Sequence, residues 1–256
     1  MASCLILGNS HVAALAAAQN AGLAATSFDR VEFIAAPRDQ LKHLVVESGR
    51  LVASDESLRM SFDKLNFSHS VDPRDFDIIV VCGLGLGLRR LMRLYVTHYA
   101  DTMRHDPGRR PLSDDCFQQA LVGLMGRSLA WNLIEKISEL GSSRMTLVPE
   151  PAPSSEVYSD HTNPGWALAK RNGDIDVLGV FYAKALDVLT KGRASLVLPK
   201  QPLEDAITSA PRYSSGSVRL TNDLTSHHDK ADLFHMNAEY GALVMATLSS
   251  IPQHES

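Results

Sequence analysis

The sequence predicts a layered α/β fold in which helices cover both faces of a mostly parallel sheet. Strand-like and helical stretches alternate along the chain, as they do in doubly wound sheets. The run 77–82 reads Asp-Ile-Ile-Val-Val-Cys, and near-continuous β-branched residues are typical of a strand buried on both faces. The 256 residues are 45% hydrophobic, which is enough for one substantial core. Because neither an internal repeat nor a linker interrupts the chain, we expect one domain over residues 1–256.

The first half of the chain contains the elements that begin the sheet. An apolar strand is followed by a polar turn and an Ala-rich stretch, which is a strong helix former. A second strand stops at Pro37, and a Glu-Ser-Gly-Arg centre between two apolar runs predicts a hairpin outside the main sheet. We expect strands at 4–7, 31–36 and 77–82, a helix at 12–21 and the hairpin at 44–53.

Helical patterns dominate the second half, and a long polar loop separates them. The loop follows Pro149 and runs through His161 and Asn163 to Trp166, and long loops at strand ends are often functional. We expect helices at 88–99, 114–124, 128–140, 178–189 and 237–249, strands at 145–148 and 195–198, and irregular chain at 210–226.

Charge and hydropathy exclude two classes of partner. The formal net charge of −4 and the isoelectric point near 6.2 give no strong positive field, so we expect no nucleic-acid partner. The longest apolar runs fall far short of the ~20 residues that span a bilayer, which predicts no membrane span. The same charge balance fits small neutral substrates. Met1 leads into an apolar run without the basic flank of a secretory signal, so we expect a cytoplasmic protein.

The cysteines predict neither a disulfide framework nor a metal site. Cys4, Cys82 and Cys116 are an odd set without metal-ligand spacing, and the first two fall in predicted buried strands. We therefore expect free thiols.

Three polar features follow predicted strands, where sites form in open parallel sheets. They are Ser10, the glycine-rich loop 83–87 and the loop 160–163. A serine that opens a helix lies near the positive end of the helix dipole, but it needs an imidazole base and a carboxylate to orient that base. Asp232 and His235 supply both groups just before the last predicted helix. These residues predict a nucleophilic serine in a Ser-His-Asp triad.

The same two blocks resemble the SGNH (GDSL-like) hydrolases. That family places its nucleophile in a Gly-Asp-Ser block after the first strand, and its acid and base in an Asp-x-x-His block near the C-terminus. This chain has Gly8-Asn9-Ser10 and Asp232-x-x-His235 in those places, and the order of elements is similar over almost the whole chain. The resemblance implies a three-layer α/β/α sandwich and an esterase or acyl hydrolase without a cofactor. It also implies a short-chain, acetyl-like ester of a carbohydrate or small molecule as substrate.

The chain departs from this family in the residues that would hold the oxyanion. Asn9 replaces the aspartate of the first block, and Gly83-Leu84-Gly85-Leu86 stands where the family has Gly-x-Asn-Asp. Backbone amides of Ser10, Gly83 or Gly85 are possible replacements, because glycine permits close backbone approach. His161 or Asn163 could also enter from the later loop, and Arg38 could contact a polar or anionic group of the substrate.

Each of the three triad residues has a structural alternative. Ser10 could cap the following helix, Asp232 could brace a turn, and His235 could be a packed histidine bonded to backbone. An O-acyltransferase with the same triad and a non-catalytic carbohydrate-binding module on the same fold also remain open, as does the oligomeric state.

Two cofactor-type sites are disfavoured by the sequence. The glycine loop lacks the last glycine of the dinucleotide fingerprint, because Leu88 stands at that position. A metal site built from His227, His228, Asp232 and His235 has no fixed geometry, so we expect solvated loop histidines there.

Overall fold

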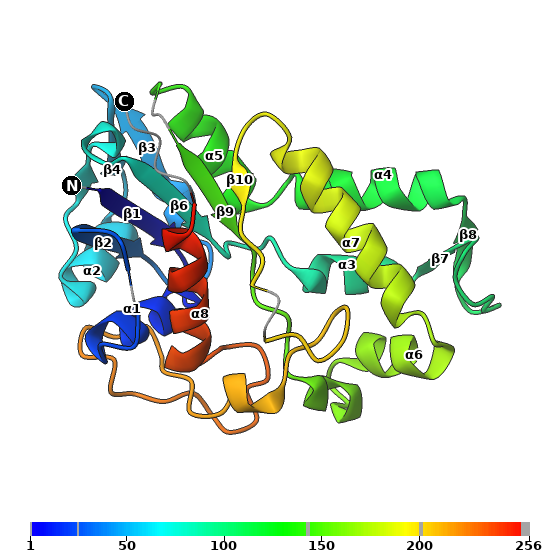
Figure 1. The fold of residues 1–256 in the computed structure, drawn as a ribbon. Coiled ribbons are helices and arrows are strands. Elements are labelled where there is room, and N and C mark those ends of the chain that lie inside the picture. Colours follow the sequence, from blue (N-terminus) through cyan, green and yellow to red (C-terminus); the bar gives the residue numbers. More distant parts are fainter. Residues whose placement is uncertain (1, 25, 142–143, 200–201, 252–256) are drawn as a thin grey trace.

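The centre of the protein is a five-stranded parallel sheet (Figure 1). The computed structural model describes residues 2–24, 26–141, 144–199 and 202–251. Every strand pair in this sheet is parallel, and Leu5 of β1 lies between Glu32 of β2 and Ile79 of β6. The sheet confirms the predicted α/β class. The strand order is β10 (Ser195–Leu196), β9 (Met145–Val148), β6 (Ile78–Cys82), β1 (Ser3–Gly8) and β2 (Arg30–Ala35).

Helices cover both faces of the sheet, as a three-layer sandwich requires. Alternate residues of β1 point to opposite faces: Leu5 and Leu7 join one buried cluster, whereas Cys4 and Ile6 join another. The first cluster includes α5 (Leu129–Ser138), and the second includes the packed pair α1 (Val12–Asn20) and α8 (Ala238–Ser249). Both faces are therefore apolar, which explains the continuous apolar runs of the central strands.

The predicted hairpin is confirmed, and it belongs to a small separate sheet. β3 (Leu44–Glu47) and β4 (Arg50–Ala53) pair antiparallel, and β5 (Ser70–Val71) pairs with β4. Ser48 and Gly49 form the turn with φ of 51° and 77°, the left-handed values that tight hairpin turns demand. The connecting segments are η1 (Gln40–His43), α2 (Glu56–Leu65) and η2 (Pro73–Asp75).

Four helices form an extension to one side of the sheet (Figure 1). Phe117 and Phe181 pack together inside it with ring centroids 4.9 Å apart, and both belong to the same buried cluster as Leu5 and Leu147 of the sheet. The extension comprises α3 (Leu88–Tyr95), α4 (Asp114–Met125), α6 (Pro164–Asn172) and α7 (Ile175–Thr190), with the strands β7 (His98–Ala100) and β8 (Arg110–Leu112) at its tip.

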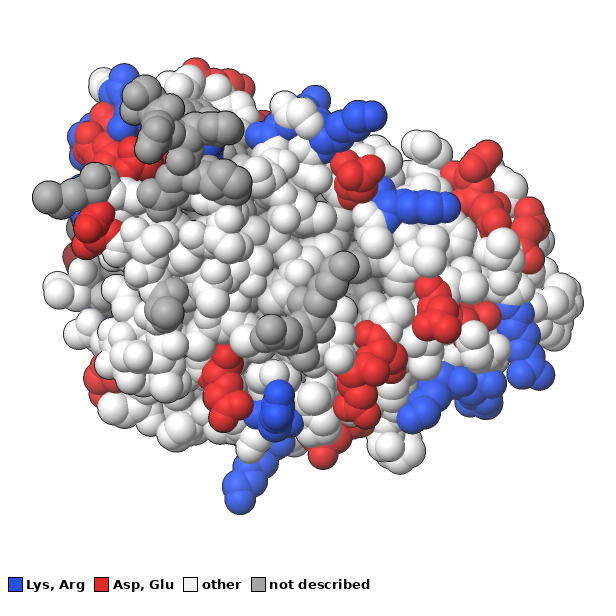
Figure 2. Space-filling view, in the orientation of Figure 1, with Lys and Arg blue, Asp and Glu red and all other residues white. Residues whose placement is uncertain are grey.

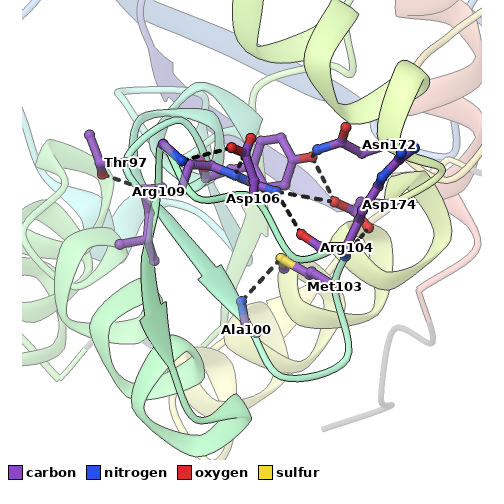
Figure 3. A network of polar contacts seen from close by, with 11 residues as sticks. Thr97, Ala100, Met103, Arg104, Asp106, Arg109, Asn172 and Asp174 are labelled. Carbon is purple, nitrogen blue, oxygen red and sulfur yellow. Dashed lines mark hydrogen bonds and ion pairs between the residues drawn. The ribbon is translucent and has the colours of Figure 1, made fainter.

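A buried arginine holds the tip of the extension together (Figure 3). The guanidinium of Arg109 lies over the ring of Tyr95, 3.2 Å from Asp106 and 3.8 Å from Asp174. The Tyr95 hydroxyl donates to Asp174 at 2.7 Å and accepts from Asn172 at 3.1 Å. This network links the end of α3 to the junction of α6 and α7. Breaking a buried ion pair on one side typically costs about 3–5 kcal/mol, so the network is a strong constraint.

Two sequence predictions in this region are wrong. The helix expected at 88–99 ends at Tyr95, because residues 98–100 pair with 110–112, a contact that local periodicity does not reveal. The loop expected up to Trp166 contains η3 (Ser155–Ser159), and α6 already begins at Pro164, where proline occupies the first turn. The segment 210–226 is irregular as expected, apart from η4 (Pro211–Tyr213).

The three cysteines are free thiols, as expected. Burial raises the pKa of both Cys4 and Cys82 to about 12, so these thiols stay protonated at neutral pH. Among the described residues, no helix combines the length and the apolar character that a bilayer span needs.

Candidate active site

Ser10 lies directly after β1, at the carboxyl edge of the sheet. Gly8 makes this exit possible, because a Cβ there would lie 2.4 Å from Val12 Cγ2 and 2.7 Å from the carbonyl oxygen of Cys82. The N-cap residue of α1 is His11, not Ser10, and the His11 side chain makes no capping hydrogen bond. The Ser10 hydroxyl instead lies 2.8 Å from His235 Nε2. The helix-cap alternative for Ser10 therefore does not describe this structure.

Asp232 and His235 occupy a turn that precedes α8. Asp232 Oδ1 accepts hydrogen bonds from the amides of Phe234 and His235 at 2.9 and 3.0 Å, which fixes the carboxylate plane. Asp232 Oδ2 then lies 2.7 Å from His235 Nδ1. Asn237 caps α8 through the amides of Glu239 and Tyr240. One carboxylate therefore braces the turn and also holds the imidazole.

The electrostatics keep Asp232 ionised. Burial alone would raise its pKa, but the hydrogen bond from His235 and the amide of Phe234 outweigh burial and bring the pKa well below its usual range. An ionised carboxylate can only accept, so His235 Nδ1 carries the proton that it donates to Asp232. His235 Nε2 is then the lone pair that faces the Ser10 hydroxyl. This is the tautomer that a general base needs.

Two further imidazoles enclose His235. His228 stacks on it with centroids 3.9 Å apart and planes 11° apart, and His11 stacks at 4.8 Å and 24°. His228 Nδ1 also lies 3.1 Å from Asp232 Oδ2, so the same oxygen serves two histidines. Burial, followed by the neighbouring His235, lowers the pKa of both His11 and His228, which favours their neutral forms.

The expectation of solvated histidines is wrong for His228 and right for His227. The side chain of His228 is 13% exposed and packed into the stack, whereas His227 is exposed. Sequence reasoning missed the stack because a loop histidine carries no periodic signal. The sequence did contain one clue to the stack: His228 lies four residues before Asp232, and His235 lies three residues after it.

A cavity of about 220 Å³ opens beside the triad. Its walls include Ser10, His235, Arg38 and Arg89, together with Glu150 and the aromatic rings of Trp166 and Phe234. The Arg89 guanidinium lies 3.7 Å from the centre of the Phe234 ring. Arg38 has φ of 57°, a left-handed conformation that costs a non-glycine residue about 1 kcal/mol. Sequence analysis pointed to Arg38 but not to Arg89, which lies inside an amphipathic helix pattern.

The glycine loop does not offer the oxyanion donors that we expected from it. The amide of Gly83 donates to the Val148 carbonyl at 2.8 Å, and the amide of Gly85 donates to Glu150 Oε1 at 2.8 Å. Gly83, Leu84 and Gly85 have φ of 73°, 55° and 77°, so the glycines serve a left-handed turn. The loop therefore links β6 to β9 through its amides.

The loop 160–163 does not contribute to the wall of the triad cavity, although the depression that Asn163 lines shares Arg89 and Trp166 with that wall. His161 is exposed and is not among the residues of its wall. Asn163 lines a different, open depression with Arg93 and Val96, and its side-chain amide donates to Asp160 Oδ2 at 2.6 Å. Neither His161 nor Asn163 is therefore part of the wall beside Ser10.

Two other donors belong to residues that line the cavity. Within the described residues, no partner engages the amide of Ser10 or the side-chain Nδ2 of Asn9. Asn9 is 8% exposed and lines the cavity, and its Oδ1 accepts the amide of His11 at 3.3 Å, which leaves Nδ2 as the free end. A Cβ on Gly83 would lie 2.6 Å from Asn9 Oδ1, so this glycine leaves room for the asparagine.

Three of the four residues considered for a metal gather in the structure. One ligand atom each from His228, Asp232 and His235 lie within 4.8 Å of one another, while His227 is not part of the group. Two imidazoles and a carboxylate are a donor set that suits zinc and similar divalent ions. Both nitrogens of His235 are already engaged, since Nδ1 lies 2.7 Å from Asp232 Oδ2 and Nε2 lies 2.8 Å from Ser10 Oγ.

Comparison with known proteins adds no assignment. Neither the search against protein-family models nor the search of curated proteins finds a match for this chain.

Proposed function

We propose that this protein is a serine esterase of the SGNH type, with Ser10 as nucleophile, His235 as general base and Asp232 as the residue that orients the base. The carrying observation is the continuous chain of contacts from Ser10 Oγ to His235 Nε2 at 2.8 Å and from His235 Nδ1 to Asp232 Oδ2 at 2.7 Å. Serine at neutral pH needs such a base, and the base needs a carboxylate. The position of Ser10 after the first strand supports the family resemblance.

In the first step, Ser10 Oγ attacks the carbonyl carbon of an ester while His235 Nε2 takes the hydroxyl proton. The Ser10 amide and Asn9 Nδ2 donate to the tetrahedral oxyanion, since both are free and both lie at the cavity. The oxyanion collapses, the alkoxide leaves with the proton from His235, and an acyl-serine remains. His235 then removes a proton from water, whose attack releases the carboxylic acid and restores Ser10.

This assignment of the oxyanion donors answers the departure from the family pattern. The asparagine that the family carries in its third block is absent, and the glycine-loop amides are engaged elsewhere. Asn9 stands where the family has aspartate, and an amide can donate to an oxyanion whereas a carboxylate cannot. Losing one such donor typically costs on the order of 100-fold in turnover. Asn9→Asp should therefore lower kcat although it restores the family residue.

Transfer of the acyl group to a hydroxyl of an acceptor follows the same chemistry. The acyl-serine is common to both reactions, and the acceptor replaces water in the second step. Arg38 and Arg89 line the cavity without an ion-pair partner among the described residues, so an anionic ester or acceptor is compatible with it.

The test is hydrolysis of short-chain chromogenic esters by the wild type and by Ser10→Ala and His235→Ala, each with circular dichroism to confirm folding. We expect both variants to lose turnover by about a thousandfold or more, because triad residues act as a unit. His161→Ala is the matched control, since this exposed histidine lies outside the cavity wall. A folded Ser10→Ala variant with wild-type activity would contradict the nucleophile assignment, and an inert wild type would favour a binding module.

A further inference from the structure

A second cavity of about 170 Å³ adjoins the one that contains Ser10. The two cavities share Leu88, Glu150 and Pro151 as wall residues. Leu88 opens α3, and the other two follow β9, so the shared wall stands at the carboxyl edge of the sheet. Seen from the cavity that contains Ser10, the second cavity therefore lies directly beyond these three residues.

The second cavity is predominantly apolar. Three segments supply the other walls: α7 with Ala183, the residues after β10 with Val197, and α8 with Tyr240. Glu150 is its only charged wall residue among those described, and Glu150 Oε1 is occupied by the Gly85 amide. The described surface between α8 and α7 is largely uncharged in Figure 2, whereas charged side chains gather toward the edges of that face. An anionic ligand would find no oppositely charged side chain on the described wall.

Exposed apolar side chains on the wall indicate that it binds an apolar group. Leu198 and Leu203 line the cavity and are 41% and 43% exposed. Exposed apolar surface gathered in a hollow often marks a ligand-binding groove. A bound alkyl chain would cover both leucines.

We propose that the second cavity binds the acyl chain of the substrate, and that the preferred chain has about six carbons. This inference rests on the proposed function. The size follows from the volume, because a dry apolar cavity of about 150 Å³ accommodates one benzene molecule. The acyl group is then longer than the acetyl group that the family resemblance implies. The alcohol or acceptor side of the ester remains in the first cavity, between Arg38 and Arg89.

The test compares kcat/KM for chromogenic acetate, butyrate, hexanoate, octanoate and decanoate esters. Each buried methylene is worth about fourfold. Hexanoate has four more methylenes than acetate, so their full burial would be worth about 250-fold. We expect kcat/KM to rise by at least about 10-fold from acetate to hexanoate, which partial burial already gives, and to fall again at decanoate. Ala183→Phe should bring the hexanoate value down to that of acetate, because the new ring takes up space in the cavity. Val180→Phe is the control, since Val180 lies on the same helix, is 52% exposed and does not line the cavity.

A binding measurement separates failure of this proposal from failure of the esterase assignment. Hexanamide and acetamide are titrated into Ser10→Ala, in which no acyl-enzyme can form, and binding is followed by calorimetry. We expect hexanamide to bind at least about 10-fold more tightly than acetamide, and Ala183→Phe in the same background to remove the difference. This result with an esterase-inactive wild type would leave the cavity assignment standing without the proposed function. An active wild type that prefers acetate, with equal binding of both amides, would overturn the cavity assignment alone.

Discussion

Replacing His228 tests whether the second histidine on Asp232 contributes to catalysis. His228 Nδ1 lies 3.1 Å from Asp232 Oδ2, and its ring covers one face of His235 at 3.9 Å. A hydrogen bond to a charged group contributes about 1.5–3 kcal/mol. The two side chains are 13% and 21% exposed, which places the value at the lower end of that range. A loss of about 1.5 kcal/mol from the transition state is about 10-fold in kcat/KM.

The assay is ester hydrolysis by His228→Ala, His228→Phe and His227→Ala. We expect both His228 variants to fall by about 10-fold, because phenylalanine retains the stacked ring but cannot donate to Asp232. His227→Ala should match the wild type, since that neighbouring histidine is exposed and its imidazole Nδ1 lies 3.3 Å from the Gly216 carbonyl oxygen, away from Asp232. If His228→Phe is as active as the wild type, the hydrogen bond to Asp232 has no catalytic role. If His228→Ala also keeps wild-type activity, the reasoning is refuted entirely.

Three further predictions concern packing, pH and metal ions. Gly241→Ala should lower the free energy of unfolding by about 1–3 kcal/mol in urea titrations, because the added Cβ would lie 2.0 Å from the Ala14 carbonyl oxygen where α8 crosses α1. The control is Gly123→Ala on α4, which should be neutral or stabilising because the space around its Cβ is open. Equal effects of the two substitutions would refute this prediction. Burial lowers the pKa of His11 in the native state, so the unfolded chain binds a proton there first as pH falls below about 6.5, and the free energy of unfolding falls on acidification. Between about pH 7.5 and 5.5, His11→Phe should therefore lose less free energy of unfolding than the wild type. An equal loss in the two proteins would contradict this sign. Zinc should inhibit ester hydrolysis reversibly by binding His228, Asp232 and His235. The His228→Ala variant should be less sensitive to zinc than the wild type, whereas His227→Ala should be as sensitive. Inactivation of the wild type by a chelator would instead argue for a metal enzyme.

The central sheet could be predicted from the sequence because its signals are local. The run Ile78–Cys82 is apolar throughout, and β9 matches the expected bounds at Met145 and Val148. The hairpin was also readable, because Ser48 and Gly49 suit a left-handed turn between two apolar runs. The failures are non-local: β7 exists only because residues 98–100 meet residues 110–112.

The site was predictable to the extent that it depends on chain order. Ser10 follows the first strand and His235 precedes the last helix, and the packing of α1 against α8 brings them together across 225 positions. The oxyanion donors could not be predicted, because the fate of the Gly83 and Gly85 amides depends on Val148 and Glu150, which lie far away in the sequence. The stack of His11 and His228 on His235 is a tertiary arrangement of the same kind.

Covalent labelling with a fluorophosphonate tests the central claim most directly, because the reagent phosphonylates a serine only when a neighbouring base activates it. The native protein is treated, digested and mapped by mass spectrometry, with Ser10→Ala and the urea-unfolded wild type as controls. We predict one adduct, on Ser10, in the native wild type and none in either control. A folded wild type without an adduct on Ser10, or with an adduct on a different residue that persists in Ser10→Ala, would contradict the account.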